Sequence, residues 1–118
     1  MLRTYPDASA PGGTGADLYI NPDTFQEIFA KATEAALTQR PLAQSTFAEP
    51  LDGEPAWKTI PSWDLVTLND HAISPACQKF MAGRARAEPT TFRAAHDVSL
   101  TRPDAVDKVI LNAAISVR

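Results

Sequence analysis

The sequence has little cysteine, no long apolar run and no excess of positive charge. Its single cysteine, Cys77, excludes an internal disulfide and a zinc site built from cysteines. No apolar stretch approaches the roughly 20 residues that cross a bilayer, so we expect no membrane partner. The 11 Lys and Arg residues against 14 Asp and Glu residues give a net charge of -3, which disfavours nucleic acid as a partner.

Glycine is also scarce, with 5 residues against 10 prolines, so proline marks most of the turns. Residues 1–15 lack the basic-then-apolar order of a secretory signal, and we therefore expect a cytoplasmic protein. With 118 residues, of which 44% are hydrophobic and 21% charged, the chain is long enough for one modest globular domain.

The first half of the chain divides into two segments. Residues 1–16 are rich in Pro, Gly, Ala and Ser without an apolar period, which predicts a flexible leader. An alternative is a ragged start left by truncation or gene-model error. Residues 17–58 contain a helix signal, because Asn21 can cap, Pro22 suits the first position and apolar residues recur at helical spacing. We expect this helix to end before Pro41, with a short helix near residues 43–47.

The second half, residues 59–118, predicts a strand–helix–strand–helix unit. Residues 63–68 are short, apolar and partly β-branched, and residues 90–94 form a weaker strand signal. Ser74 opens the first helix, and residues 101–104 resemble a capping box for the second. Such a unit makes two parallel strands and places the chain in the α/β class. The buried stripe expected on the first helix comprises Cys77, Phe80, Met81 and Ala85.

Two chemically active side chains follow the two predicted strands. Asp70 comes after the first strand and His96 after the second, and the carboxyl ends of parallel strands meet at one edge of a sheet. A carboxylate beside an imidazole orients the ring and stabilises its protonated form, as in a hydrolase triad. Two alternatives remain open: a solvated Asp with an incidental His, or a mixed metal site formed with His71 and Asp97.

A longer ordered series of residues supports the triad interpretation. It comprises Ile60-Pro61-Ser62-Trp63, Asp70, Ile73-Ser74-Pro75, Gln78-Lys79-Phe80-Met81-Ala82, Arg84-Ala85, His96 and Thr101-Arg102-Pro103-Asp104-Ala105-Val106, preceded by Asp17-Leu18-Tyr19 and Gln39-Arg40-Pro41-Leu42. This series resembles the C-terminal part of an α/β-hydrolase, of the bacterial esterase and haloperoxidase-related subgroup. The resemblance implies ester hydrolysis without a cofactor or metal. It also implies that residues 17–58 are a helical cap segment, that Asp70 is the triad acid and that His96 is the triad base.

The chain departs from this family where the nucleophile should be. None of its serines lies in a Gly-x-Ser-x-Gly motif, and no oxyanion-hole segment follows an early strand. A histidine base without a nucleophile and oxyanion donors loses orders of magnitude in rate. We therefore expect the isolated chain to be inactive on small esters.

The predicted sheet has too few strands to be stable alone, because parallel strands need neighbours and both faces covered. We therefore expect a homo-oligomer or a partner chain that supplies the missing strands. Three hypotheses follow: a hydrolase remnant, a subunit that donates Asp70 and His96 to an N-terminal partner, or a non-catalytic module that dimerises through the strand edge.

Overall fold

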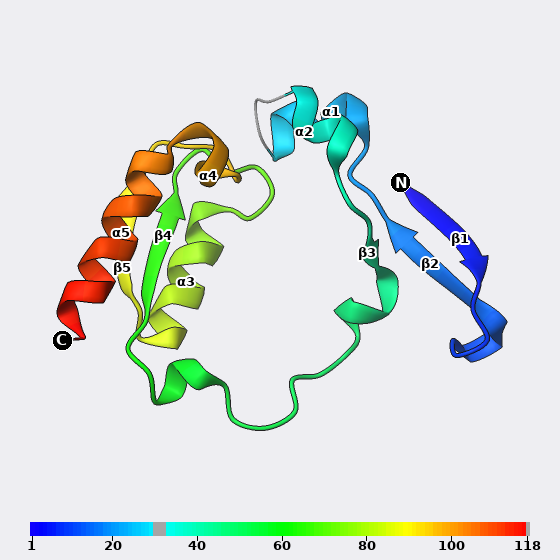
Figure 1. The fold of residues 1–118 in the computed structure, drawn as a ribbon, viewed down its shortest axis with the longest axis horizontal. Helices are drawn as coiled ribbons and strands as arrows, with labels where there is room; N and C mark the ends of the chain where they lie inside the picture. The colour runs from blue at the N-terminus through cyan, green and yellow to red at the C-terminus, as the bar shows by residue number, and fades with distance from the viewer. Residues whose placement is uncertain (30–32, 118) are drawn as a thin grey trace.

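Two small sheets, one antiparallel and one parallel, lie on opposite sides of the molecule (Figure 1). The structure is a computed structural model that describes residues 1–29 and 33–117. The antiparallel sheet and two short helices belong to the first half of the chain, and the parallel sheet with its helices belongs to the second half. An irregular segment, interrupted by the 3-10 helix η3 (Ala56–Lys58), connects the two parts (Figure 1).

The antiparallel sheet begins with a hairpin where the sequence predicted a flexible leader. Strands β1 (Leu2–Pro6) and β2 (Thr14–Leu18) pair antiparallel, and β2 also pairs with the short strand β3 (Leu42–Ala43). Gly12 and Gly13 have φ values of 83° and 71° in the turn, a conformation that glycine adopts without steric cost. The glycine-rich composition that suggested flexibility therefore belongs to a specific turn.

Two helices follow the hairpin. Helix α1 (Pro22–Ile28) begins as predicted, with Oδ1 of Asn21 accepting a hydrogen bond from the Asp23 N–H at 3.1 Å. Helix α2 (Thr33–Thr38) ends before the proline that was expected to stop the helix. The sequence predicted one continuous helix, and its middle, residues 30–32, lies outside the described residues. The short helix predicted near residues 43–47 is confirmed as the 3-10 helix η2 (Gln44–Phe47).

The second half confirms the predicted order of strand, helix, strand and helix. Strand β4 (Trp63–Thr67) and strand β5 (Glu88–Phe92) pair in parallel, and helix α3 (Pro75–Ala85) connects them. Two further helices follow, α4 (Val98–Thr101) and α5 (Pro103–Ser116). Both α3 and α5 contact β4, which lies between them (Figure 1). The chain thus combines helices and strands with a parallel two-stranded sheet.

The apolar stripe predicted for α3 is wrong. The buried residues of α3 are Gln78 and Ala82, whereas Cys77, Phe80 and Met81 are exposed and Ala85 is half-buried. The two buried residues are four apart and share one face of the helix, which packs on β4. That face is selected by the hydrogen bonds of the Gln78 amide rather than by apolar periodicity.

The capping box predicted at residues 101–104 is also wrong. Arg102 precedes α5 without a side-chain capping bond, and Thr101 belongs to α4. The residue that caps a helix here is Asp97, which caps α4, because its Oδ1 accepts a hydrogen bond from the Leu100 N–H at 3.3 Å. A separate turn of helix thus occupies the place where the sequence suggested the start of α5.

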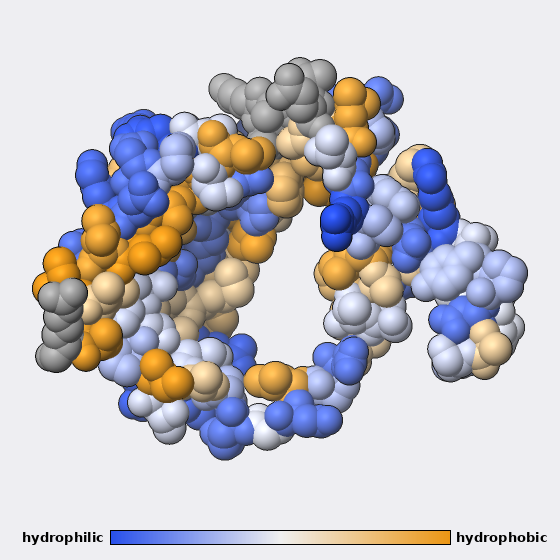
Figure 2. All heavy atoms as spheres, in the orientation of Figure 1, coloured by the Kyte–Doolittle hydropathy of each residue, from blue (hydrophilic) through white to orange (hydrophobic). Residues whose placement is uncertain are grey.

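The molecule is expanded for its length. Its radius of gyration is 17.1 Å, whereas a compact domain of this length has about 13.5 Å. Its accessible surface is 8706 Å², against roughly 6,200 Å² for a compact monomer of 12.7 kDa. Figure 2 shows an opening through the molecule between the two parts, and apolar residues gathered over α5. No helix among the described residues is long and apolar enough to cross a membrane.

Candidate active site

Asp70 and His96, which the sequence placed at two strand ends, are in direct contact. Nδ1 of His96 lies 2.8 Å from Oδ2 of Asp70. Asp70 follows β4 and His96 follows β5, so the parallel pairing of the two strands brings both residues to one edge of the sheet. The Asp70 side chain is 2% exposed and the His96 side chain 27% exposed. The carboxylate is therefore buried while the imidazole remains accessible.

Four further hydrogen bonds hold the Asp70 carboxylate in place. Oδ1 accepts from the backbone N–H groups of Ala72 at 2.8 Å and Ile73 at 2.9 Å. Oδ2 accepts from the Thr67 hydroxyl at 2.9 Å and from Nε2 of Gln78 at 2.7 Å. Both oxygens are thus saturated with donors, a surrounding that stabilises the ionised form.

The electrostatics of the site favour a charged Asp70. Burial alone would raise the pKa of the Asp70 carboxyl. The hydrogen bonds from the Ile73 N–H, His96, the Thr67 hydroxyl and the Ala72 N–H outweigh burial and lower this pKa below its ordinary value of 3.8. Asp70 is therefore an anion at neutral pH, the form that can stabilise a protonated imidazole.

Gln78 is a part of the site that sequence reasoning did not find. Its Oε1 accepts from the Thr67 N–H at 2.9 Å, and its Nε2 donates to Oδ2 of Asp70 and to the Ile73 carbonyl, each at 2.7 Å. A single amide thus links the end of β4, the loop after it and α3. The available signal was a polar residue four positions after the capping Ser74, on the face that Ala82 continues.

His96 is positioned from its other side by the end of α1. The Phe29 ring lies 4.5 Å from the His96 ring, centroid to centroid, and 5.2 Å from the Phe25 ring. The N–H of Asp97 donates to the Phe29 carbonyl at 2.9 Å. These contacts tie the first half of the chain to the loop that carries the histidine. Sequence reasoning assigned Phe29 to a helix stripe but did not place it against His96.

A cavity of about 840 Å³ lies beside the imidazole. His96 and Asp97 line it together with residues from β2, α1, α2, β3 and the 3-10 helix η2. The lining is mostly apolar and includes Leu18, Phe25, Phe29, Leu42, Phe47 and Leu100. The space next to His96 can therefore take an apolar group, with Arg40 and Asp97 as the charged residues of its lining.

The site has an acid and a base but no nucleophile within hydrogen-bonding reach among the described residues. The serine hydroxyls bond to neighbours in their own loops or helices, as seen for Ser9, Ser62, Ser74, Ser99 and Ser116. Cys77 is exposed on α3. The pair can orient an imidazole and accept a proton, and no serine or cysteine of the described residues is bonded to the imidazole.

The alternative of a metal site finds no support in the geometry. His71 is exposed in the loop after β4, and Asp97 caps α4. Within residues 1–29 and 33–117, no group of three or more His, Cys, Asp or Glu side chains could hold a metal ion. The imidazole and carboxylate of His96 and Asp70 are instead bonded to each other.

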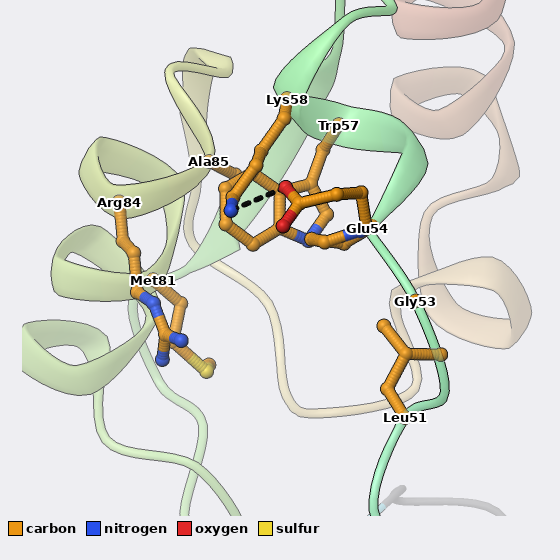
Figure 3. Close-up of a pocket in the computed structure, with 9 residues that line it drawn as sticks. Leu51, Gly53, Glu54, Trp57, Lys58, Met81, Arg84 and Ala85 are labelled. Atoms are coloured by element: carbon orange, nitrogen blue, oxygen red, sulfur yellow. Dashed lines mark hydrogen bonds and ion pairs between the residues drawn. The ribbon is translucent and has the colours of Figure 1, made fainter.

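A second cavity, of about 580 Å³, lies at the other end of α3 (Figure 3). Arg84 and Met81 reach it from α3, and Trp57 and Lys58 from η3, with Lys58 paired to Glu54 (Figure 3). The Arg84 guanidinium lies 5.9 Å from the Trp57 ring centroid. The pair in this cavity is an ion pair of two exposed side chains without an imidazole, so the first cavity remains the candidate active site.

Compared with protein-family models, curated proteins and solved structures, the chain matches none of them. A functional assignment therefore rests on the geometry around Asp70 and His96.

Proposed function

We propose that this chain is part of an α/β-hydrolase of the esterase-like kind and supplies the acid and the base for hydrolysis of a small carboxylic ester. The observation that carries the proposal is the hydrogen bond of 2.8 Å between Nδ1 of His96 and Oδ2 of Asp70. The bond uses Nδ1 and leaves Nε2 for a nucleophile. The position of both residues at the carboxyl ends of parallel strands supports the same interpretation.

In the first half of this reaction, the Asp70–His96 pair carries one proton from the attacking serine to the leaving group. Nε2 of His96 takes the proton of an attacking serine hydroxyl, and the imidazolium that forms is stabilised by the Asp70 anion. The same proton then passes to the leaving alkoxide as the ester bond breaks and the acyl-serine forms. A water molecule then attacks the acyl-serine, and His96 takes a proton from this water and passes it to the serine oxygen. The carboxylic acid product leaves and the serine is regenerated. The buried, fully bonded carboxylate keeps the imidazole in one orientation throughout.

The serine comes from a polypeptide segment outside these 118 residues, because the sequence contains no Gly-x-Ser-x-Gly motif. The chain alone is therefore inactive, and a nucleophile-bearing partner completes the site. The expanded shape supports this proposal, since the accessible surface of the chain exceeds that of a compact monomer by about 2,500 Å². The apolar cavity beside His96 suits the acyl or alkyl group of the ester.

A non-catalytic module that dimerises is the second candidate function. The exposed apolar side chains of α5 favour it, because Ile110, Leu111 and Ile115 are 59%, 60% and 65% exposed. Such a row of apolar residues is typical of an interface between protein chains. In this alternative the bond between Asp70 and His96 is structural.

Mixing distinguishes the two functions. The chain is assayed on p-nitrophenyl acetate alone and with the polypeptide encoded directly upstream of it. We expect that the chain alone shows no turnover that depends on His96. We expect that the mixture hydrolyses the ester. In the mixture, His96→Ala abolishes activity, whereas His71→Ala, the matched control in an exposed loop, retains it. A fluorophosphonate probe labels a serine of the upstream polypeptide in the active mixture.

Two results contradict the proposal. One is a mixture without turnover that contains a stable homodimer of the chain, which favours the non-catalytic module. The other is turnover by the chain alone that His96→Ala abolishes, which requires a nucleophile within these residues.

A further inference from the structure

The backbone of β4 uses only one of its two edges in the parallel sheet. The Ser62 carbonyl accepts from the Glu88 N–H at 2.9 Å, and the Leu68 N–H donates to the Phe92 carbonyl at 2.8 Å. Even-numbered residues of β4 therefore direct their backbone groups toward β5. Because successive residues of a strand alternate, the odd-numbered residues direct theirs toward the other edge. No strand among the described residues pairs with that edge.

The free edge is capped at one end and open at the other. At Thr67 the outward N–H already donates to Oε1 of Gln78 at 2.9 Å. The outward groups of Trp63 and Leu65 have no strand beside them in the described part of the chain. Each of these two residues offers one N–H donor and one carbonyl acceptor, the pattern that a further strand would bind.

The outer edge of β5 is a poorer docking site. Glu88, Thr90 and Phe92 bond toward β4, so Pro89 lies on the outer edge, where it has no N–H to donate. Strand β4, by contrast, is covered by both α3 and α5, and its Val66 is 0% exposed. Coverage of both faces is typical of an interior strand of a parallel sheet. Strand β4 thus has the surroundings of an interior strand and an unpaired edge.

A cavity lies beside part of this edge, between Leu65 and the Asp70–His96 pair. A cavity of about 210 Å³ is lined by Asp64 and Leu65, whose side chains leave opposite faces of β4, and by Met81 of α3. The cavity therefore follows the edge of the strand rather than one face. Its lining also includes Asp70 and His96. A segment bound along the edge would reach the candidate active site.

We propose that the free edge of β4 binds an extended segment of a second polypeptide, which runs parallel to β4, is apolar on both faces and carries a basic side chain beside Asp64. The apolar faces match the coverage by α3 and α5, and the basic residue complements the half-buried carboxylate of Asp64. The inference rests on the proposed function for the partner's identity, the nucleophile-bearing polypeptide, and it adds where that polypeptide docks.

A second copy of the chain fits this edge less well. A two-fold antiparallel pairing that uses both Trp63 and Leu65 places Asp64 directly opposite its own copy. Like charges directly opposite each other destabilise a strand pair. The Gln78 amide on Thr67 also removes the outward N–H that a shifted register would need. The charge of Asp64 therefore favours a partner of different sequence.

The test uses the full chain and synthetic peptides of valine and alanine, apolar on both faces, with a central lysine or a central glutamate. Fluorescence anisotropy measures binding. We expect the lysine peptide to bind roughly threefold to tenfold more tightly than the glutamate peptide. Asp64→Lys reverses this preference, and Glu88→Lys, the same charge change on the neighbouring strand, does not. N-methylation of the peptide amides that face Trp63 and Leu65 removes binding.

Direction and independence are tested with the same peptides. A nitroxide on the C-terminus of the lysine peptide broadens the NMR signals of His96 and spares the Trp63 indole, as parallel binding requires. The anisotropy assay contains no ester, so docking is measured separately from catalysis. Circular dichroism checks that each variant is folded.

Three results overturn the inference. They are equal binding of the lysine and glutamate peptides, undiminished binding of the N-methylated peptide, and cross-links between Trp63 residues of two copies. Binding that stays selective while the mixed ester assay shows no turnover refutes the proposed function and keeps the docking site.

Discussion

Nε2 of Gln78 donates to Oδ2 of Asp70 at 2.7 Å, the same oxygen that accepts the hydrogen bond from His96. The amide of α3 thus fixes the carboxylate that in turn orients the imidazole. Gln78 is buried, and it also bonds the Thr67 N–H at the end of β4. The geometry of the candidate active site therefore depends on Gln78, which acts on His96 through the Asp70 carboxylate.

Gln78→Leu should destabilise the chain. The substitution leaves the Thr67 N–H and part of the Asp70 carboxylate without partners, at a cost of about 1–3 kcal/mol. Urea denaturation measures the free energy of unfolding. Lys79→Leu, the adjacent exposed position, should change that free energy by no more than about 0.5 kcal/mol. Equal effects of the two substitutions would contradict the role given to Gln78.

The stability of the chain should fall in acid because of Asp70. The pKa of Asp70 is lower in the folded chain than its ordinary value of 3.8, so ionisation favours folding. The stabilisation is complete above the unfolded pKa and is lost as the pH falls through the folded pKa. Urea denaturation from pH 7 down to pH 2 should show a difference between the chain and Asp70→Asn that shrinks below about pH 4. Parallel curves for the two proteins would contradict this account.

The meeting of Asp70 and His96 could be predicted from the sequence because it depends on chain order and parallel pairing alone. Two residues that follow adjacent parallel strands reach the same edge whatever the side chains between them do. The order of strands and helices was predictable for a different reason, because Ser74 and Pro75 give a strong local signal for the start of α3.

The buried face of α3 could not be predicted, because apolar periodicity assumes that burial follows hydrophobicity. Here the buried Gln78 is selected by its partners at the end of β4, while Phe80, 69% exposed, faces outward. The hairpin at the N-terminus was missed for a different reason. Its turn uses Gly12 and Gly13 at positive φ, and composition alone does not separate such a turn from a flexible segment.

The exposed apolar face of α5 predicts self-association of the isolated chain. Ile110, Leu111 and Ile115 are more than half exposed, and contact between copies would remove them from water. Sedimentation at micromolar concentration should show species larger than a monomer, and Leu111→Lys combined with Ile115→Lys should reduce them. Lys108→Leu, on the same helix, should not. A compact, stable monomer would contradict the prediction.

The most direct test of the central claim is the protonation of the two ring nitrogens of His96. In the ¹⁵N-labelled chain at neutral pH, NMR couplings between ring nitrogens and ring protons report which nitrogen carries the proton. The account predicts that neutral His96 is protonated on Nδ1, which donates to Asp70, and has a free Nε2. A neutral His96 protonated on Nε2, with the same spectrum as the exposed His71, would contradict it.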